Sequence, residues 1–178
     1  LEKLGVKPDL AIGDFDSLGY VPKARRVSKH PQHKDQSDLE LALERVSTRR
    51  YLHIHVYGAL GGRLDHTLAN LQLFASYAEQ GFDITAIDTN CALRVLVGPD
   101  AFDLPPFKSG TVSVFSATDV SHGVSERGLE YPLDDADLTN RTSLGLSNEL
   151  IGQEAAISVA EGTLYVFYPL ADSAVVSE

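Results

Sequence analysis

The 178-residue sequence contains a single cysteine, Cys91, and no methionine. One cysteine excludes an internal disulfide framework and a zinc site made from several cysteines. Basic residues are also scarce, because 15 Lys and Arg stand against 25 Asp and Glu, for a formal net charge of -10. Nucleic acid is bound through clustered basic side chains, so in a chain with this charge balance we expect no nucleic-acid partner. An acidic protein still binds an anion where a metal ion is held locally.

Long apolar runs are missing as well, and so is a signal-peptide pattern. We therefore expect a cytoplasmic protein with no membrane partner. The nucleotide-binding patterns G-x-x-x-x-G-K-[ST] and G-x-G-x-x-G are also absent. The first residues, LEKLG, have the spacing of a final helical turn followed by a glycine cap. We expect part of the first domain to lie upstream of them.

Hydrophobic residues make up 43% of the chain, enough for one large core or two small ones. Strand-like and helical segments alternate up to residue 98, an order typical of an α/β layer. Residues 98–110 are rich in Pro and Gly and predict a linker. Short strand-like runs follow, without a long helical pattern. The expected elements are strands at 10–13, 51–60, 82–88 and 92–98, helices at 37–50 and 64–80, and later strands at 111–117, 128–133, 155–160 and 163–170.

The expected fold class is an α/β domain at residues 1–98, incomplete at its N-terminus and built on a mainly parallel sheet, then an all-β sandwich at residues 107–178. The apolar stripes expected to face the core are Leu39, Ala42, Leu43 and Val46 in the first helix, and Leu64, Leu68, Leu71, Ala75 and Ala78 in the second. In a parallel α/β sheet, ligands bind beyond the carboxyl ends of the strands. Three polar stretches of the sequence occupy such positions.

The first polar stretch, GDFDS, follows the strand predicted at residues 10–13. Asp14 and Asp16 are two residues apart, and in an extended chain such residues point to the same side. Two carboxylates aimed at one point suit Mg²⁺, which takes oxygen ligands and keeps substrate phosphates as partners. A polar turn explains the same residues without a metal, because Asp and Ser are ordinary turn residues.

The second polar stretch, HPQHKDQSD, precedes the first predicted helix. Asp35 or Ser37 is expected to cap this helix, and Asp38 suits its first turn, so both acids have a purely structural explanation. Lys34 lies beside the positive end of the helix, where a cation is unfavourable unless an anion is present. Because helix N-termini bind phosphate well, Lys34 is a candidate phosphate ligand.

The third polar stretch, GALGGRLDHTLAN, leads into the second predicted helix. Its adjacent glycines let the backbone approach a ligand closely, and Arg63 can form two hydrogen bonds to a phosphate. Asp65 and His66 follow at the start of the helix. A flexible turn with Asp65 as the helix cap is the structural alternative, and it explains Asp65 better than Arg63.

Taken together and in this order, GDFDS, KDQSDLELAL and GGRLDHTLAN closely resemble the bacterial type of thiamine pyrophosphokinase. In the second half, GLEYPLDDADLTN, LGLSNELIG and ISVAEGTLYVF resemble the thiamine-binding β domain of that family. The resemblance covers nearly the whole chain. The family also places a strand and an acid-Gly-Gly segment before the position of Leu1, in keeping with the expected upstream segment.

The resemblance implies a homodimeric, Mg²⁺-dependent enzyme that moves pyrophosphate from ATP to the hydroxyethyl group of thiamine, giving thiamine diphosphate and AMP. It implies that acids hold the metal, that Lys34 and Arg63 bind phosphates, and that Asp65 orients Arg63 or contacts the side of the nucleophile. The implied metal ligands are Asp14, Asp16 and Asp38, and the implied catalytic set adds Lys34, Arg63 and Asp65. The implied ligand contacts are Ser17, Gln32, Asp35, His66, Ser147 and Asn148.

Three other functions are compatible with parts of the sequence. A related enzyme class transfers pyrophosphate to a pterin alcohol, although the thiamine-type β domain argues against it. A phosphatase would use Asp14 as its nucleophile, but Leu18 stands where such D-x-D motifs prefer Thr or Val. A non-catalytic sensor of thiamine or nucleotide is disfavoured by the full set of candidate catalytic residues. Ser147 and Asn148 are also explained as a polar turn after Gly145.

Overall fold

The computed structural model describes residues 4–16, 18–31, 35–49, 51–105 and 107–170. The chain divides into two compact units, residues 1–51 and residues 52–178, which are treated separately below. Unit 1 contains two parallel strands, β1 (Leu10–Gly13) and β2 (Arg26–Lys29), followed by helix α1 (Asp38–Ser47). The predicted strand and helix of this region are both confirmed. Strand β2 was not predicted, because its side chains are mostly exposed and show no hydrophobic alternation.

Helix α1 begins where its sequence provides a cap. The Ser37 side chain accepts a hydrogen bond from the backbone N–H of Glu40 at 3.1 Å, so Ser37 rather than Asp35 is the N-cap. Leu41 and Leu43 are the buried apolar residues of the helix, whereas Leu39, Ala42 and Val46 are half-buried. The stripe predicted for this helix therefore included Leu43 correctly and missed Leu41.

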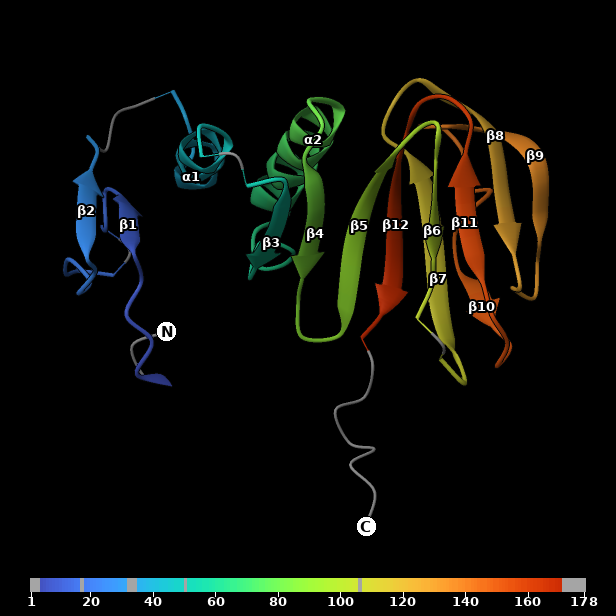
Figure 1. The fold of residues 1–178 in the computed structure, drawn as a ribbon, viewed down its shortest axis with the longest axis horizontal. Helices are drawn as coiled ribbons and strands as arrows, with labels where there is room; N and C mark the ends of the chain where they lie inside the picture. Colours follow the sequence, from blue (N-terminus) through green and yellow to red (C-terminus); the bar gives the residue numbers. More distant parts are fainter. Residues whose placement is uncertain (1–3, 17, 32–34, 50, 106, 171–178) are drawn as a thin grey trace, which may run out of the picture. The chain divides into compact units, whose positions relative to one another are not determined.

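Unit 2 holds the second helix and the remaining strands (Figure 1). Its first elements are β3 (His53–Tyr57), α2 (Leu64–Glu79), β4 (Asp83–Ile87), β5 (Cys91–Val97) and β6 (Asp100–Asp103). Its later strands are β7 (Gly110–Ser116), β8 (Val120–Arg127), β9 (Leu133–Thr139), β10 (Asn148–Leu150), β11 (Ala156–Val159) and β12 (Thr163–Pro169). The predicted linker therefore contains a strand, β6, which pairs with β11.

The strands of unit 2 form two sheets of mixed direction. One sheet has the order β10-β7-β12-β5-β4-β3, and the other has the order β6-β11-β8-β9. Among the described strands, only β1–β2 and β3–β4 pair in parallel, so a mainly parallel sheet is not confirmed. The physical reason is the short connection from β4 to β5, because a tight turn joins antiparallel strands and a parallel pair needs a longer crossover.

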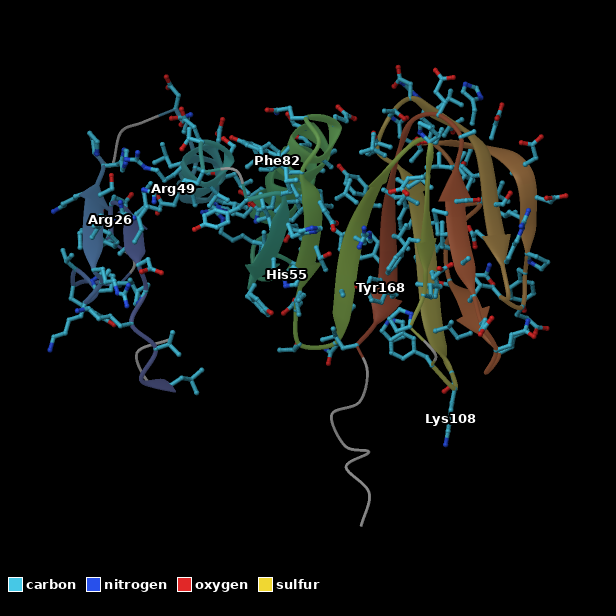
Figure 2. All side chains as sticks on the ribbon, viewed as in Figure 1. Arg26, Arg49, His55, Phe82, Lys108 and Tyr168 are labelled. Carbon is cyan, nitrogen blue, oxygen red and sulfur yellow. The ribbon has the colours of Figure 1, made fainter. Side chains whose placement is uncertain are left out.

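The two sheets share one hydrophobic core. Val114 and Leu164 from the first sheet belong to the same buried cluster as Val124 and Ile157 from the second. At the margin of this core, Tyr168 of β12, which is labelled in Figure 2, has its ring centroid 5.2 Å from that of Phe102 of β6. Because β5 pairs with β12 along its whole length, the first sheet joins segments from both predicted domains. The domain limits at 1–98 and 107–178 stay a prediction.

Helix α2 packs on the sheet that contains β4, β5 and β12 (Figure 1). The Tyr165 hydroxyl donates to the carbonyl of Leu71 at 2.8 Å, and the Thr163 hydroxyl donates to the Glu79 carboxylate at 2.7 Å. Ala75 and Ala78 of the predicted stripe are buried, but Leu64 and Leu68 are exposed, at 85% and 59%. Within the described residues, no helix is long and apolar enough to cross a membrane.

Candidate active site

The aspartate pair lies in a turn directly after β1. The strand ends at Gly13, and Phe15 has a left-handed backbone with φ 63°, so the chain is not extended between the two acids. The carboxylate of Asp14 accepts a hydrogen bond from the backbone N–H of Asp16 at 3.0 Å. Alternation along a strand was therefore the wrong reason to group these residues. The turn itself brings them together, because both line one cavity.

Asp38 lies against the end of the same strand. A Cβ atom placed on Gly13 would come within 2.5 Å of the Asp38 Oδ2 atom, and Gly13 has φ 142°, which side chains rarely permit. Gly13 thus lets the carboxylate of Asp38 approach the backbone that leads into Asp14. Asp38 is also the first residue of α1, where the helix dipole favours negative charge.

The cavity beside the aspartate turn has a volume of about 270 Å³ and is open to solvent. Within the part of the chain that the structure describes, the charged residues lining it are Asp14, Asp16 and Lys29. Lys29 ends β2 and pairs with Gly13 in the register of the parallel strands, which explains its position beside the turn. Lys29 was not predicted as a site residue, because β2 is mostly exposed and has no hydrophobic alternation to mark it as a strand. Lys29 becomes a candidate site residue only once the end of β2 is known to lie there.

The donor set of this region suits Mg²⁺ in particular. Among the described residues, no three His, Cys, Asp or Glu side chains form a cluster ready to hold a metal ion. Mg²⁺ does not require one, because it is commonly held by one or two carboxylates, with waters and substrate phosphates completing its shell. Two carboxylates on one cavity, and a third fitted against Gly13, meet that requirement.

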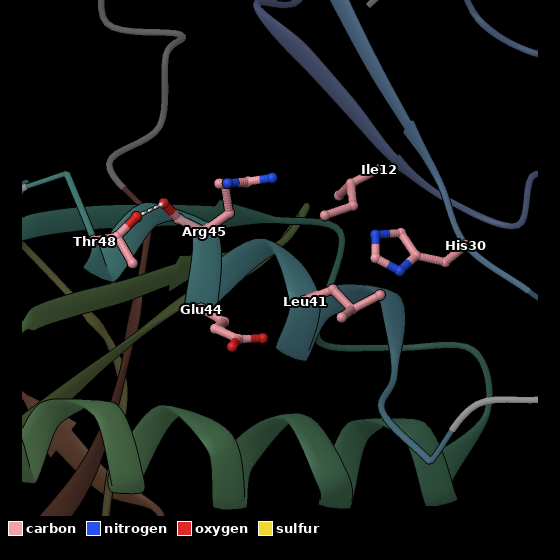
Figure 3. A pocket seen from close by; sticks show the side chains of 6 residues that line it. All are labelled: Ile12, His30, Leu41, Glu44, Arg45 and Thr48. Carbon is pink, nitrogen blue, oxygen red and sulfur yellow. Dashed lines mark hydrogen bonds between the residues drawn. The ribbon is translucent and has the colours of Figure 1, made fainter.

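The other predicted site residues of unit 1 are Ser17, Gln32, Lys34 and Asp35. Ser17, Gln32 and Lys34 lie outside the described residues, and Asp35 is exposed before α1. A second cavity of unit 1, of about 230 Å³, lies between β1, the end of β2 and α1. The ring of His30 points toward Ile12 and Leu41 in it (Figure 3). Its lining residues are Ile12, His30, Leu41, Glu44, Arg45 and Thr48, which include no predicted site residue.

In unit 2, Arg63 and Asp65 form an exposed pair at the start of α2. The Arg63 guanidinium donates to both oxygens of Asp65, at 3.1 Å from Nε to Oδ1 and 2.5 Å from Nη2 to Oδ2. This contact lowers the pKa of Asp65 to about 2 and raises the pKa of Arg63. Arg63 is the N-cap position and makes no capping hydrogen bond, so Asp65 does not cap the helix. His66 follows and is exposed.

Ser147 and Asn148 differ sharply in their surroundings. Ser147 is exposed and has a left-handed backbone with φ 59°, and its N–H donates to the Ser113 hydroxyl at 3.0 Å. Asn148 is buried, with 5% of its surface exposed. Its amide donates to Glu126 at 2.7 Å and to the Tyr131 carbonyl at 2.8 Å. Its oxygen accepts from the N–H groups of Tyr131 and Glu149 at 3.0 and 2.9 Å.

These bonds use the whole hydrogen-bonding capacity of the Asn148 side chain, which is two donors and two acceptor positions. The partner Glu126 is fully buried on β8. Burial raises the pKa of Glu126 to about 7, although the hydrogen bond from Asn148 opposes that shift. Glu126 was not predicted from the sequence, because no pattern around it marks a buried acid.

Comparison with known proteins agrees with both halves of the chain. Residues 1–86 match the family described as thiamin pyrophosphokinase, catalytic domain, and residues 102–164 match its vitamin B1 binding domain. The thiamine pyrophosphokinase of Bacillus subtilis (strain 168) is 31% identical over 168 residues, which cover 90% of this chain and 78% of that protein.

Solved structures give the same result. A crystal structure of thiamine pyrophosphokinase from Bacillus subtilis superposes with a TM-score of 0.82 at 28% identity, covering 95% of this chain and 82% of that one. A thiamin pyrophosphokinase family protein from Enterococcus faecalis gives 0.80 at 28% identity, covering 97% and 84%. With both domains matched in sequence and fold, the chain belongs to the thiamine pyrophosphokinase family and is an enzyme of that class.

Proposed function

We propose that the chain transfers pyrophosphate from ATP to the hydroxyethyl oxygen of thiamine in the presence of Mg²⁺. The thiamine hydroxyl oxygen attacks the β-phosphorus and its proton passes to solvent, the bond from that phosphorus to the bridging oxygen of the α-phosphate breaks, and AMP leaves with that oxygen. The observation that carries the proposal is the grouping of Asp14, Asp16 and Lys29 on one cavity, in a chain whose catalytic-domain match includes them. Positioning and charge neutralisation are the main demands of phosphoryl transfer.

Asp14, Asp16 and Asp38 are the residues that we propose to hold Mg²⁺, directly or through water. When bound, the ion would neutralise charge on the phosphate oxygens. The three side chains supply only oxygen donors, and the turn leaves Asp16 exposed. The hydrogen bond from the Asp16 N–H to Asp14 holds one carboxylate in place before any ligand arrives.

Basic residues are proposed to bind the phosphates of ATP. Lys29 lines the cavity beside the aspartates, and Lys34 and Asp35 precede α1 in the sequence. In unit 2, Asp65 fixes the guanidinium of Arg63 through two hydrogen bonds, which leaves the remaining N–H groups of Arg63 oriented for an anion. Ser17, Gln32 and His66 are proposed as further contacts to the nucleotide.

Ser147 is proposed to contact thiamine, and Asn148 to support it from beneath. The exposed hydroxyl of Ser147 is accessible to a ligand, whereas Asn148 has no hydrogen-bonding position left. The match to a vitamin B1 binding domain includes both residues, and it disfavours a pterin alcohol as acceptor. We also propose a homodimer, as the resemblance of the sequence to its family implies.

The test is release of AMP from ATP and Mg²⁺ by the protein, measured with and without thiamine. We expect AMP to appear only with thiamine and to equal the thiamine diphosphate formed. AMP formation that does not depend on thiamine, or that requires an added pterin alcohol instead, would contradict the proposal. Thiamine binding by calorimetry without any AMP would show a sensor rather than an enzyme.

A paired variant experiment tests the site itself. Asp16→Asn removes a cavity carboxylate, and the matched control, Asp9→Asn, removes an exposed carboxylate of the same unit that pairs with Arg25 at 3.1 Å. We expect thiamine-dependent AMP formation to fall only in Asp16→Asn. Equal activity of the two variants would exclude Asp16 from the site.

A further inference from the structure

Glu126 is an acidic residue in the core of unit 2. Its side chain has no exposed surface, and in the sheet register it pairs with Ile157 of β11 and Leu133 of β9. A carboxyl group among apolar residues is costly unless hydrogen bonds offset the loss of water. Burial of Glu126 therefore costs free energy, and its hydrogen bonds indicate the role that offsets this cost.

One oxygen of Glu126 has a partner and the other has none. Oε2 accepts a hydrogen bond from the Asn148 amide at 2.7 Å, while Oε1 is buried without a partner among the described residues. Asn148 makes its other bonds to the backbone of Tyr131 and Glu149, and these fix the amide in a single orientation. Glu126 thus completes the set of bonds around Asn148.

Residues 143–147, here named the Ser147 turn, precede Asn148, and Gly145 of this turn lies close to Glu126. A Cβ atom on Gly145 would collide with the carbonyl of Val114 and lie 3.3 Å from Glu126 Oε1. The Gly145 carbonyl accepts from the Val114 N–H at 2.8 Å, which holds the turn on β7. Ser147 follows in its left-handed conformation, next to Asn148. Glu126 therefore lies beside the turn at Gly145 and is linked to the residue after it through the hydrogen bond with Asn148.

We propose that Glu126 is a positioning residue for the thiamine acceptor: by fixing Asn148, it holds Ser147 in the left-handed conformation that presents its hydroxyl. This inference rests on the proposed role of Ser147 in thiamine binding. Glu126 itself touches no substrate, because it has no exposed surface. Its effect falls on the binding of thiamine and not on ATP or on the chemical step.

The experiment compares Glu126→Leu and Glu126→Met with Glu126→Gln in steady-state kinetics. The first two variants remove the hydrogen-bond acceptor and place an apolar side chain in the core. In the third, the side-chain carbonyl of Gln still accepts from Asn148. We expect KM for thiamine to rise about tenfold in the Leu and Met variants, with kcat and KM for ATP changed by less than about twofold. We expect Glu126→Gln to stay within about threefold of the parent in KM for thiamine.

Exposed Glu161 provides the matched control, since Glu161→Gln changes an acid of unit 2 outside this contact. Thermal melting followed by circular dichroism shows that each variant is folded. Unchanged KM for thiamine in folded Leu and Met variants would overturn the positioning role, and so would an equal rise in Glu126→Gln. A parent protein that makes no thiamine-dependent AMP would instead contradict the proposed function, so the two failures are distinct.

Discussion

The turn after β1 and the Ser147 turn both carry polar residues that the sequence singled out, but the two regions treat them differently. In the turn after β1, Asp16 is exposed, Asp14 is half-buried, and both face a cavity of about 270 Å³. Directly after the Ser147 turn, Asn148 is buried and all its hydrogen-bonding positions are occupied within the protein. The aspartates of the first region retain capacity for a ligand, whereas Asn148 has none left, and in the second region the exposed Ser147 hydroxyl is the accessible group.

This difference indicates how each motif contributes to function. A carboxylate that faces a cavity contributes when a ligand arrives, so its loss affects activity more than stability. A buried amide with every position bonded contributes to the fold, so its loss affects stability first. A motif residue is therefore assigned a direct or a supporting role by its unused hydrogen-bonding capacity.

The largest expected effect is the loss of activity in Asp16→Asn. We expect thiamine-dependent AMP formation to fall on the order of 10²–10³-fold, because the proposed Mg²⁺ site would lose one of its carboxylates. The melting temperature should stay close to that of the parent, since Asp16 is exposed. Measurement of both quantities on one preparation, beside Asp9→Asn, checks the result. If the loss of activity were explained by a fall in melting temperature, Asp16 would have a structural role like that of Asn148, and the difference between the two regions would not hold.

Asn148→Leu tests the opposite half of the comparison. The substitution leaves Glu126 without its hydrogen-bond donor and leaves two backbone N–H groups without their acceptor. We expect the free energy of unfolding to fall by about 3 kcal/mol, as measured by urea denaturation. Exposed Asn140, which donates to Asp119 at 3.2 Å, gives the control Asn140→Leu with little change expected. Equal stability of the two variants would contradict the supporting role of Asn148.

How far the sequence could predict these regions depends on the range of the interactions. Local signals sufficed for α1 and for the end of β1, because a cap at Ser37 and a glycine after a buried run act within a few residues. The aspartate pair was also found, although for the wrong geometrical reason, since Phe15 adopts a left-handed conformation. These features depend on residues next to them in the sequence, so the local sequence is enough to predict them.

Long-range features were not predictable in the same way. Leu64 and Leu68 fit a helical stripe, but which turns of α2 are covered depends on the strands that pack against it. The bond between Glu126 and Asn148 joins residues 22 positions apart, and an acid inside the sandwich contradicts the usual pattern of a strand. The resemblance to a family identified Asn148, but it did not indicate that the side chain is buried.

A pH series sharpens the comparison further, because Glu126 is the buried acid of the second region. Its pKa rises from 4.5 to about 7 on folding, so the folded protein retains this proton where the unfolded chain has lost it. Stability from this group is complete below pH 4.5 and is lost as pH rises through about 7. We expect the parent to lose about 2–3 kcal/mol of unfolding free energy from this group between pH 5 and pH 8.

Glu126→Gln should remove that loss, because Gln does not titrate. The measurement is the unfolding free energy of parent and variant at several pH values, and the difference between the two curves isolates residue 126. Glu161→Gln, an exposed acid, serves as the control and should follow the parent. Parallel curves for Glu126→Gln and the parent would show that Glu126 ionises in the folded protein as it does in water.

The smallest expected effect concerns Ser37, which caps the helix that carries Asp38. Ser37→Ala removes the hydrogen bond to the Glu40 N–H at 3.1 Å, so we expect a loss of about 1 kcal/mol in unfolding free energy. The Asp38 carboxylate lies against Gly13 at the same end of α1, and a frayed first turn weakens that placement. We therefore expect the Mg²⁺ concentration for half-maximal activity to rise by about twofold. Ser37→Asp, which keeps a capping oxygen, should restore both values, and a Mg²⁺ requirement unaffected by fraying would separate Asp38 from the metal.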